Sequence, residues 1–347
     1  MKLSEFKYTV PKNSIAKYPA DPRDGAKLMV VDRETGKMQA KKFRNLVSLL
    51  QKGDCLVLNE TRVFPARLKG TKEKTNAEIE VMLLRELKRD ERIWDVLVEP
   101  ARKVRIGNKI YFDDNSFYCE VIDNTTSRGR TVKFGKTDNL FDLIERIGEM
   151  PLPDYMEREP TEQDKEFYQT VFANRDYLAS IAPPTAGLHF TDKLLNKLQQ
   201  KGVKIAKIVL NIGQGVFEKI EVEDLTKHRM YSEYFNIPFE AAETIIKSLK
   251  SKKKVVAVGS SVARALEASV LTTGAVKPNK GWTDKFIYPP YEFKVVTGLI
   301  TNFQPPRSPS LLLSAAFAGK ELLFDAYKKA AKDGYRFFAY GDAIYFI

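Results

Sequence analysis

A change of sequence pattern at Arg62, and again at Pro151, constrains the fold more than any other feature. Between these two positions the chain consists of short apolar segments with partial alternation, separated by charged or turn-forming stretches. This pattern is typical of antiparallel strands. The strand candidates are Glu78–Leu84, Ile93–Glu99, Lys109–Phe112, Phe117–Ile122 and Arg130–Phe134. Five or six short strands at this spacing predict a small antiparallel β-barrel.

After Pro151, helical runs alternate with apolar strands. The expected helix and strand pairs are Asp192–Lys201 with Val203–Leu210, Glu240–Lys250 with Lys254–Val258, Val262–Leu271 with Val295–Ile300, and Glu321–Lys332 with Tyr335–Phe338. Gly202 and Gly334 stand where glycines commonly end helices. This alternation predicts a layered α/β domain with a substantial parallel component.

The two patterns together predict one domain inserted into another. Because Asp54–Leu58 is apolar and reads as a buried strand, the first part of the chain fits the α/β domain. We therefore expect residues 1–61 and 153–347 to form a discontinuous α/β domain that carries the substrate site. Residues 62–152 are expected to form the inserted barrel. A length of 347 residues, 43% of them hydrophobic, is sufficient for two such domains.

The charge balance favours a polyanionic partner such as nucleic acid, because the formal net charge is +12. The expected barrel segment is nearly neutral, so the two flanking segments carry most of this excess. No apolar run approaches the roughly 18 residues of a membrane span, and the first residues lack the apolar stretch of a signal peptide. Cys55 and Cys119 have no CxxC spacing, which argues against structural zinc and favours reduced thiols in the cytoplasm.

The segment Ser180–Phe190 has the composition of a rigid loop. Pro183 and Pro184 remove two amide donors, so no regular helix or ladder is expected to run through them. His189 lies just before Thr191, a helix N-cap signal. A stiff loop ahead of a helix exposes amide donors and a titratable imidazole to a ligand. The alternative is a structural loop whose histidine caps or packs.

Other glycine- and proline-bearing loops follow strand candidates. They are Val209–Phe217, Val256–Glu267, Gly281–Phe293, Leu299–Leu313 and Tyr335–Ala343. The second places Gly259 and two serines before a helix, which suits an anion cradle, although dinucleotide and P-loop fingerprints are absent. Ligands commonly bind at the carboxyl ends of strands in α/β sheets, so these loops predict one composite pocket. Aromatic rings near Asp284, Glu292 or Asp342 would suit a cationic ligand; the alternative is packing and turn formation.

Ordered motifs extend over essentially the whole chain. They are Tyr18-Pro19, Pro22-Arg23-Asp24, Leu58–Val63, Pro65–Arg67, Pro100–Lys103, Gly148–Pro153, Tyr168–Ala173, Ala182–Phe190, Gly281–Lys294, Ile300–Phe303 and Tyr335–Ala343. On these motifs the chain resembles the S-adenosylmethionine:tRNA ribosyltransferase-isomerase family of queuosine biosynthesis. The resemblance implies an α/β domain with an inserted β-barrel, in agreement with the prediction from sequence pattern.

The resemblance also implies a reaction. The ribosyl part of S-adenosylmethionine is transferred and isomerised onto a 7-aminomethyl-7-deazaguanine base at the tRNA wobble position, giving epoxyqueuosine-tRNA, adenine and methionine. S-adenosylmethionine is then a consumed co-substrate, with no other cofactor and no metal. The implied partners are S-adenosylmethionine and a tRNA anticodon stem-loop, and we expect a cytoplasmic monomer. The sulfonium acidifies the C5′ hydrogens, so the reaction needs a base there, and an acid would assist departure of adenine.

The resemblance and the residue chemistry together suggest roles for individual side chains. His189 is the first acid–base candidate because an imidazole titrates near neutral pH, and Asp284, Glu267 and Asp342 come second. The expected substrate-binding residues are Thr185, Gly187, Phe190, Gly213, Gly215, Arg264, Tyr288, Asn302, Arg307 and Asp342. The expected tRNA-binding residues are Arg62, Arg67, Arg102 and Lys103, which can hold phosphates.

Three histidines that are usual in relatives are replaced in this chain. Asn211 stands in the motif that commonly reads L-H-x-G-x-G, Gln304 in N-F-H-x-P, and Tyr231 in M-H-S-E. Asparagine and glutamine keep hydrogen-bonding capacity but do not shuttle protons near neutral pH. Our first hypothesis is an active transferase-isomerase. The second is a catalytically impaired paralogue that binds tRNA and nucleoside, and the third is a general RNA-binding barrel protein. The general RNA-binding protein would leave the rigid loops unexplained.

Overall fold

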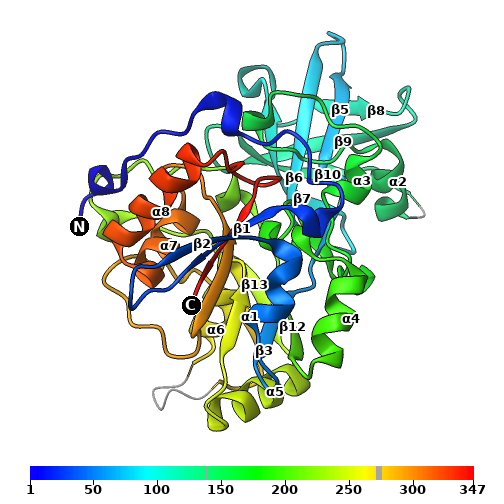
Figure 1. Cartoon of the computed structure of the whole chain (residues 1–347). Coiled ribbons are helices and arrows are strands. Elements are labelled where there is room, and N and C mark those ends of the chain that lie inside the picture. Colours follow the sequence, from blue (N-terminus) through cyan, green and yellow to red (C-terminus); the bar gives the residue numbers. More distant parts are fainter. Residues whose placement is uncertain (138, 271–275) are drawn as a thin grey trace.

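The computed structural model describes residues 1–137, 139–270 and 276–347. Within these residues the chain forms a nine-stranded mixed sheet with helices on both faces, and a closed six-stranded barrel. Figure 1 shows the barrel, coloured cyan to teal, at one end of the molecule beyond the large sheet. The fold class expected from the sequence, a layered α/β domain with an antiparallel barrel, is confirmed.

The large sheet has the strand order β15-β13-β12-β3-β14-β16-β17-β1-β2. Its strands are β1 (Lys27–Val31), β2 (Met38–Lys42), β3 (Cys55–Asn59), β12 (Lys204–Leu210), β13 (Glu233–Ile237), β14 (Val255–Val258), β15 (Asn279–Thr283), β16 (Gly298–Asn302) and β17 (Ala343–Phe346). The strands β12, β3, β14 and β16 are parallel neighbours. Their carboxyl ends therefore meet at one edge of the sheet.

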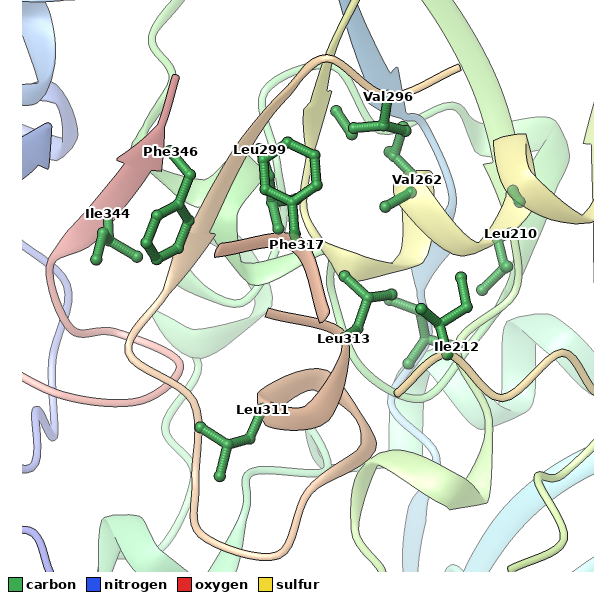
Figure 2. Packing of buried hydrophobic residues seen from close by; sticks show 14 of the residues in the cluster. Leu210, Ile212, Val262, Val296, Leu299, Leu311, Leu313, Phe317, Ile344 and Phe346 are labelled. Carbon is green, nitrogen blue, oxygen red and sulfur yellow. The ribbon is translucent and has the colours of Figure 1, made fainter. Parts of the chain in front are cut away.

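Helices cover both faces because alternate residues of the buried strands point to opposite sides. On one face, Met29 and Val31 of β1 belong to the same buried cluster as residues of α5 (Phe239–Lys250), α6 (Ser260–Ala268), α7 (Pro309–Ala318) and α8 (Lys320–Lys332). Leu28 and Val30 pack with α1 (Leu46–Leu49) and α4 (Asp192–Gln200) on the other face. Figure 2 shows part of the first cluster, where side chains from α6 and α7 lie near those of β16 and β17.

The barrel has its own hydrophobic core and the order β10-β7-β6-β5-β8-β9. Its strands are β5 (Arg67–Lys72), β6 (Glu78–Lys88), β7 (Ile93–Glu99), β8 (Lys109–Phe112), β9 (Phe117–Asn124) and β10 (Gly129–Phe134). All five strand candidates are present, and β5 closes the barrel. The helix α2 (Leu140–Ile147) packs on this core through Leu140 and Ile144.

The short strand β4 (Arg62–Val63), which precedes the barrel in sequence, pairs with β11 (Leu178–Ser180), which follows it. The helix α3 (Asp164–Phe167) lies in the sequence between the barrel and β11. The strands β1 to β3 belong to the large sheet, as do β12 to β17. This arrangement supports a discontinuous α/β domain, while the boundaries at residues 61/62 and 152/153 remain our proposal.

Most helix and strand predictions after Pro151 match within a few residues, and one does not. Tyr335–Phe338 was expected to be a strand, but Phe337 only bridges to Ile15, and the strand is β17 further on. The cause is a turn in which Phe338 has a positive φ of 71°. Leu271, the last residue of one expected helix, lies outside the described residues. In the part of the chain that is described, no helix is long and apolar enough to cross a membrane.

Candidate functional site

A cleft lies at the edge where the parallel strands β12, β14 and β16 end. We call it the strand-end cleft, and its free volume is about 130 Å³. Its lining includes Thr185, Leu210, Gly215, Val216, Glu233, Ser260, Ser261, Arg264, Lys285, Phe286, Thr301, Gln304 and Ser310. Apart from Glu233, these residues come from the loops in which the sequence predicted a composite pocket and from the rigid segment at Thr185. Ala339 of the loop Tyr335–Ala343 lines the cleft as well.

Two helices begin at the strand-end cleft. Helix α6 begins at Ser260, directly after Gly259, whose φ of 94° is one that glycine adopts readily. Helix α7 begins at Pro309 and is capped by Ser308, whose Oγ accepts a hydrogen bond of 3.2 Å from the Leu311 amide. The hydroxyls of Ser260 and Ser310 are 2.8 Å apart, so the two N-termini converge. Free amides and helix dipoles make such a place favourable for an anion.

A buried ion pair forms another part of the same cleft. Arg264 of α6 contacts the carboxylate of Glu233, which is the first residue of β13. The Gly213 amide donates a 2.8 Å hydrogen bond to Glu233 Oε1. Burial lowers the pKa of Arg264 to about 10, with nearby Asp284 opposing that shift. Arg264 lines the strand-end cleft, and its Nε is buried with no hydrogen-bond partner among the described residues.

A second cleft lies between the barrel and the edge of the sheet, with a free volume of about 540 Å³. We call it the barrel–sheet cleft. Its lining includes Phe64, Arg85, Trp94, Asp95, Phe141, Asn211, Gly213, Gln214, Tyr231, Glu233, Tyr234 and Trp282. Glu233 therefore borders both clefts. The two clefts are neighbours rather than separate sites.

His189 does not line either cleft. It ends the short 3-10 helix η8 (Thr185–His189), is only 5% exposed, and packs against Phe43 with ring centroids 4.9 Å apart. Burial lowers its pKa to about 3, and the positive charges of Arg336 and Arg23 act in the same direction. The imidazole is therefore neutral at pH 7, and its environment corresponds to the structural alternative weighed for this loop. Its catalytic role stays an untested prediction.

Glu267 is also away from both clefts. Its carboxylate accepts hydrogen bonds of 3.0–3.2 Å from the backbone amides of Lys294, Val295 and Val296, and another from the Tyr291 hydroxyl. These donors fix the loop that precedes β16. Asp284 lines neither cleft, but unlike Glu267 it is exposed and close enough to Arg264 to influence its pKa.

Several expected substrate-binding residues have structural surroundings. Asp342 accepts 2.8 Å hydrogen bonds from the amides of Lys27 and Arg336, which joins β1 to the turn before β17. Asn302 donates to the carbonyls of Phe338 and Ala339. Neither residue lines the strand-end cleft or the barrel–sheet cleft.

Gly187 and Phe190 hold the rigid loop in place. A Cβ at Gly187 would lie 2.8 Å from the Phe172 ring, so glycine is needed there for packing. Phe190 is buried against Phe43 and Phe172. Thr185, Gly215 and Arg264 do line the strand-end cleft, and Gly213 lines the barrel–sheet cleft.

Tyr288 and Arg307 lie outside both linings. Tyr288 packs against Phe286, a residue of the strand-end cleft, with ring centroids 4.9 Å apart. Arg307 is exposed, and its Nε donates a 2.9 Å hydrogen bond to the carbonyl of Ile220. Both residues therefore support neighbouring loops.

The four expected tRNA-binding cations divide into two pairs. Arg102 and Lys103 are exposed on the short 3-10 helix η5 (Ala101–Lys103) of the barrel. Arg62 and Arg67 are half-buried, and Arg67 is 3.5 Å from Glu80. The structure does not gather the four into one cluster beside the strand-end cleft.

The residues that replace the usual histidines lie near the clefts. Gln304 lines the strand-end cleft, and its amide donates 2.7 Å to the Thr301 hydroxyl. Asn211 lines the barrel–sheet cleft and accepts a 3.2 Å hydrogen bond from Thr61. Tyr231 lines it too, and its hydroxyl donates 2.6 Å to Glu218.

The sequence reasoning missed Glu233 and Lys285 as site residues. Glu233 lies two residues after Tyr231 in the same motif, and nothing in that motif indicated that its carboxylate would line a cleft. Lys285 directly follows Asp284, but nothing in the spacing indicated which of the two side chains would line the cleft. Ser260 and Ser261 were recognised as part of a cradle.

The model of the family described as "Queuosine biosynthesis protein" matches residues 3–346. A Chloroherpeton thalassium protein named S-adenosylmethionine:tRNA ribosyltransferase-isomerase is 54% identical over 99% of both chains. One of the same name from Amoebophilus asiaticus is 50% identical over the full length of both. The crystal structure of S-adenosylmethionine tRNA ribosyltransferase from Thermotoga maritima is 33% identical, covers 99% of this chain and 100% of that one, and gives a TM-score of 0.55.

These similarities confirm the class of protein expected from the sequence, an enzyme of the ribosyltransferase-isomerase type. The matches span whole chains and include both the barrel and the α/β sheet. The chain belongs to the queuosine biosynthesis protein family.

Proposed function

We propose that this protein transfers and isomerises the ribosyl moiety of S-adenosylmethionine onto 7-aminomethyl-7-deazaguanine at the wobble position of tRNA. The products are epoxyqueuosine-tRNA, adenine and methionine, and S-adenosylmethionine is consumed as a co-substrate without a metal. The protein is proposed to act as a cytoplasmic monomer on the anticodon stem-loop. The support comes from family membership together with the polarity of the strand-end cleft.

The observation that carries the proposal is the combination of two helix N-termini and one carboxylate in the strand-end cleft. The N-termini of α6 and α7 suit the carboxylate of the methionine part, because amide donors and helix dipoles favour anions. Glu233 suits the positive charge of the sulfonium or amino group, and the Phe286 ring offers a face to the same charge. A single ligand that carries both a carboxylate and positive charge, as S-adenosylmethionine does, satisfies both requirements.

Proton transfer is assigned by position rather than by residue type. A base must reach a C5′ hydrogen, and an acid must assist adenine. His189 and Glu267 are buried among structural partners, whereas Asp284 is exposed near Arg264 and Glu233 borders the cleft. We therefore propose Asp284 as the first acid–base candidate and add Glu233 as the second. Arg264 and Lys285 would hold negative charge that develops on the departing groups.

The basic side chains are proposed to act on the tRNA backbone. Arg102 and Lys103 are exposed on the barrel and free to approach phosphates, while Arg62 and Arg67 would act closer to the domain boundary. The target base lies in a single-stranded loop, so it can leave its neighbours without opening a duplex.

The test is incubation with S-adenosylmethionine and tRNA that carries the aminomethyl-deazaguanine base, followed by nucleoside mass spectrometry. Release of adenine and a new epoxyqueuosine peak, both dependent on the protein, are expected. Tight tRNA binding with neither product would contradict the proposal.

One observation favours the catalytically impaired paralogue as a second candidate. The chain has only two histidines; His189 is buried, and His228 packs on Phe286 with ring centroids 4.7 Å apart. Gln304 and Asn211 occupy cleft positions where relatives commonly carry an imidazole. A paralogue of this kind would bind tRNA and S-adenosylmethionine with ordinary affinity and release no adenine.

A further inference from the structure

Exposed aromatic rings border the barrel–sheet cleft. Trp282 is 55% exposed and Tyr231 is 38% exposed. Trp282 of β15 stands directly opposite Tyr234 of β13 in the strand pairing, with ring centroids 5.9 Å apart. We call Tyr231, Tyr234 and Trp282 the aromatic ledge. Large exposed rings beside a cleft are costly in water and indicate a surface that a partner covers.

The barrel contributes to the position of this ledge. The guanidinium of Arg85, on β6, lies 5.4 Å from the centre of the Trp282 ring. Arg85 also pairs with Asp95 at 3.1 Å, which orients it across the cleft. The ledge is therefore built on β13, β15 and the segment just before β13, and a barrel side chain contacts it from the other side.

A single short segment separates the ledge from the strand-end cleft. Gly213 and Gln214 line the barrel–sheet cleft, whereas Gly215 and Val216 line the strand-end cleft. Glu233 borders both. A chain-like ligand with one unit in the strand-end cleft would therefore place its neighbouring unit over the segment 213–216 and against the ledge.

The chemistry of the aromatic ledge indicates which kind of ligand unit it would bind. Every nucleobase has a ring face that stacks on tryptophan or tyrosine without regard to sequence. Cations lie close by on β6 and the turn that follows it: Arg85, and Arg89, whose guanidinium lies 5.6 Å from the Phe141 ring. These can approach phosphates. A cleft volume of about 540 Å³ falls in the range of sites that enclose small organic molecules, so a nucleotide fits.

We propose that the barrel–sheet cleft is a second nucleotide subsite, which stacks an unpaired RNA base adjacent to the one that enters the strand-end cleft. Trp282 supplies the main stacking face, Tyr231 and Tyr234 flank it, and Arg85 holds the neighbouring phosphate. This assignment rests on the proposed function for the identity of the ligand as tRNA. The proposed subsite adds a contact with a second base of the RNA, beyond the contacts that bind the reacting base.

The chain offers an internal reporter for the test. It has two tryptophans, Trp94 and Trp282, and both line this cleft. Trp94 is only 2% exposed, so stacking of a base is expected to quench Trp282. Titration with an anticodon stem-loop RNA should quench the fluorescence, whereas a fully duplex RNA of the same length should quench it little. In Trp282→Phe the quenching should largely disappear while the affinity is mostly retained.

Removal of the ring gives the quantitative test. Trp282→Ala should bind the stem-loop about 5-fold to 150-fold more weakly, the range for loss of one base–aromatic stack. Its affinity for S-adenosylmethionine, measured by equilibrium dialysis, should be unchanged. The matched control is Phe239→Ala, which removes a ring that is 66% exposed, just beyond the opposite end of β13. That control should leave RNA affinity unchanged, and melting temperatures establish that all variants are folded.

Wild-type affinity in folded Trp282→Ala would overturn the subsite. So would self-association of the protein that Trp282→Ala abolishes while RNA affinity stays normal, because the ledge would then be a protein interface. Failure of the proposed function is a different result: stem-loop binding and quenching without adenine release would leave the subsite intact. Adenine release with normal kcat/KM in Trp282→Ala would leave the function intact and remove the subsite.

Discussion

Two buried carboxylates beside helix α6 lie in opposite circumstances. Glu233, the first residue of β13, pairs with Arg264 in the middle of the helix, beside the strand-end cleft, and accepts a single backbone amide, from Gly213. Glu267, near the C-terminal end of the helix, accepts three consecutive backbone amides and a tyrosine hydroxyl. Both are less than 10% exposed. The two carboxylates are therefore similarly buried but have different roles in the structure.

What differs is how completely each carboxylate is satisfied by its own chain. The oxygens of Glu267 are taken up by fixed donors, so this residue can do little except hold the loop. Glu233 and Arg264 line the strand-end cleft, and Arg264 Nε has no partner in the part of the chain that the structure describes. A buried polar group that still has capacity beside a cleft is the one that can meet a ligand.

The largest expected effect is at Asp284, which is close to Arg264 and therefore tests the side of the comparison that faces the cleft. Asp284→Asn should lower the single-turnover rate of adenine release by about 10²-fold to 10⁴-fold, if its carboxylate transfers the proton. Stability should change by less than about 0.5 kcal/mol, because Asp284 is exposed. Glu292→Gln is the matched control, since it removes another exposed carboxylate from the same loop. A near-normal rate in Asp284→Asn would transfer the role to Glu233.

A slightly smaller effect is expected at Glu267. Glu267→Ala should lower the free energy of unfolding by about 3–5 kcal/mol, because three buried amides lose their acceptor. Urea unfolding measures this loss, and Glu267→Gln should recover part of it by offering one amide oxygen. If the folded fraction of Glu267→Ala has lost its reaction rate while stability is unchanged, Glu267 is catalytic and the contrast between the two carboxylates is wrong.

The smallest expected effect concerns His189, which is buried near the positive charges of Arg336 and Arg23. Its pKa of about 3 lies below the ordinary 6.5, so the unfolded chain binds a proton that the folded chain does not bind in this pH range. The contribution to stability is present above pH 6.5 and is lost as the pH falls toward 3, by up to about 1.4 kcal/mol per pH unit.

The measurement compares urea unfolding of wild type and His189→Asn between pH 7 and pH 5. Wild type should lose more stability than the variant over this interval, and the reaction rates of the two folded proteins should be similar at pH 7. An identical pH dependence of stability, together with a large loss of rate in the variant, would restore His189 as an acid–base residue.

The sequence predicted the architecture because its periodicities are local. Five barrel strands, the alternation after Pro151 and the glycine-ended helices all depend on neighbours a few residues apart. The strand β17 was missed because positive φ at Phe338 redirects the chain, and a phenylalanine in that conformation gives no sequence signal. Its neighbours β16 and β1 are far from it in sequence.

The site was predicted only as far as its loops. Ser260 and Ser261 were recognisable because a glycine and two serines after a strand form a local pattern. The choice between Glu233 and Glu267 depends on which carboxylate meets three amides from a distant loop, and that is decided by tertiary packing. His189 was preferred for its intrinsic pKa, which burial has lowered.

The position of β17 between β16 and β1 has a consequence for the order of assembly during synthesis. The early strands β1 and β2 contact the rest of the sheet through residues 343–346, which the ribosome adds some 300 residues later. Until then, residues 27–42 have no neighbouring strand to pair with, and their apolar side chains remain exposed to solvent. The barrel, continuous from β5 to β10, needs no such late partner. We expect the inserted domain to fold on the ribosome well before the domain that surrounds it.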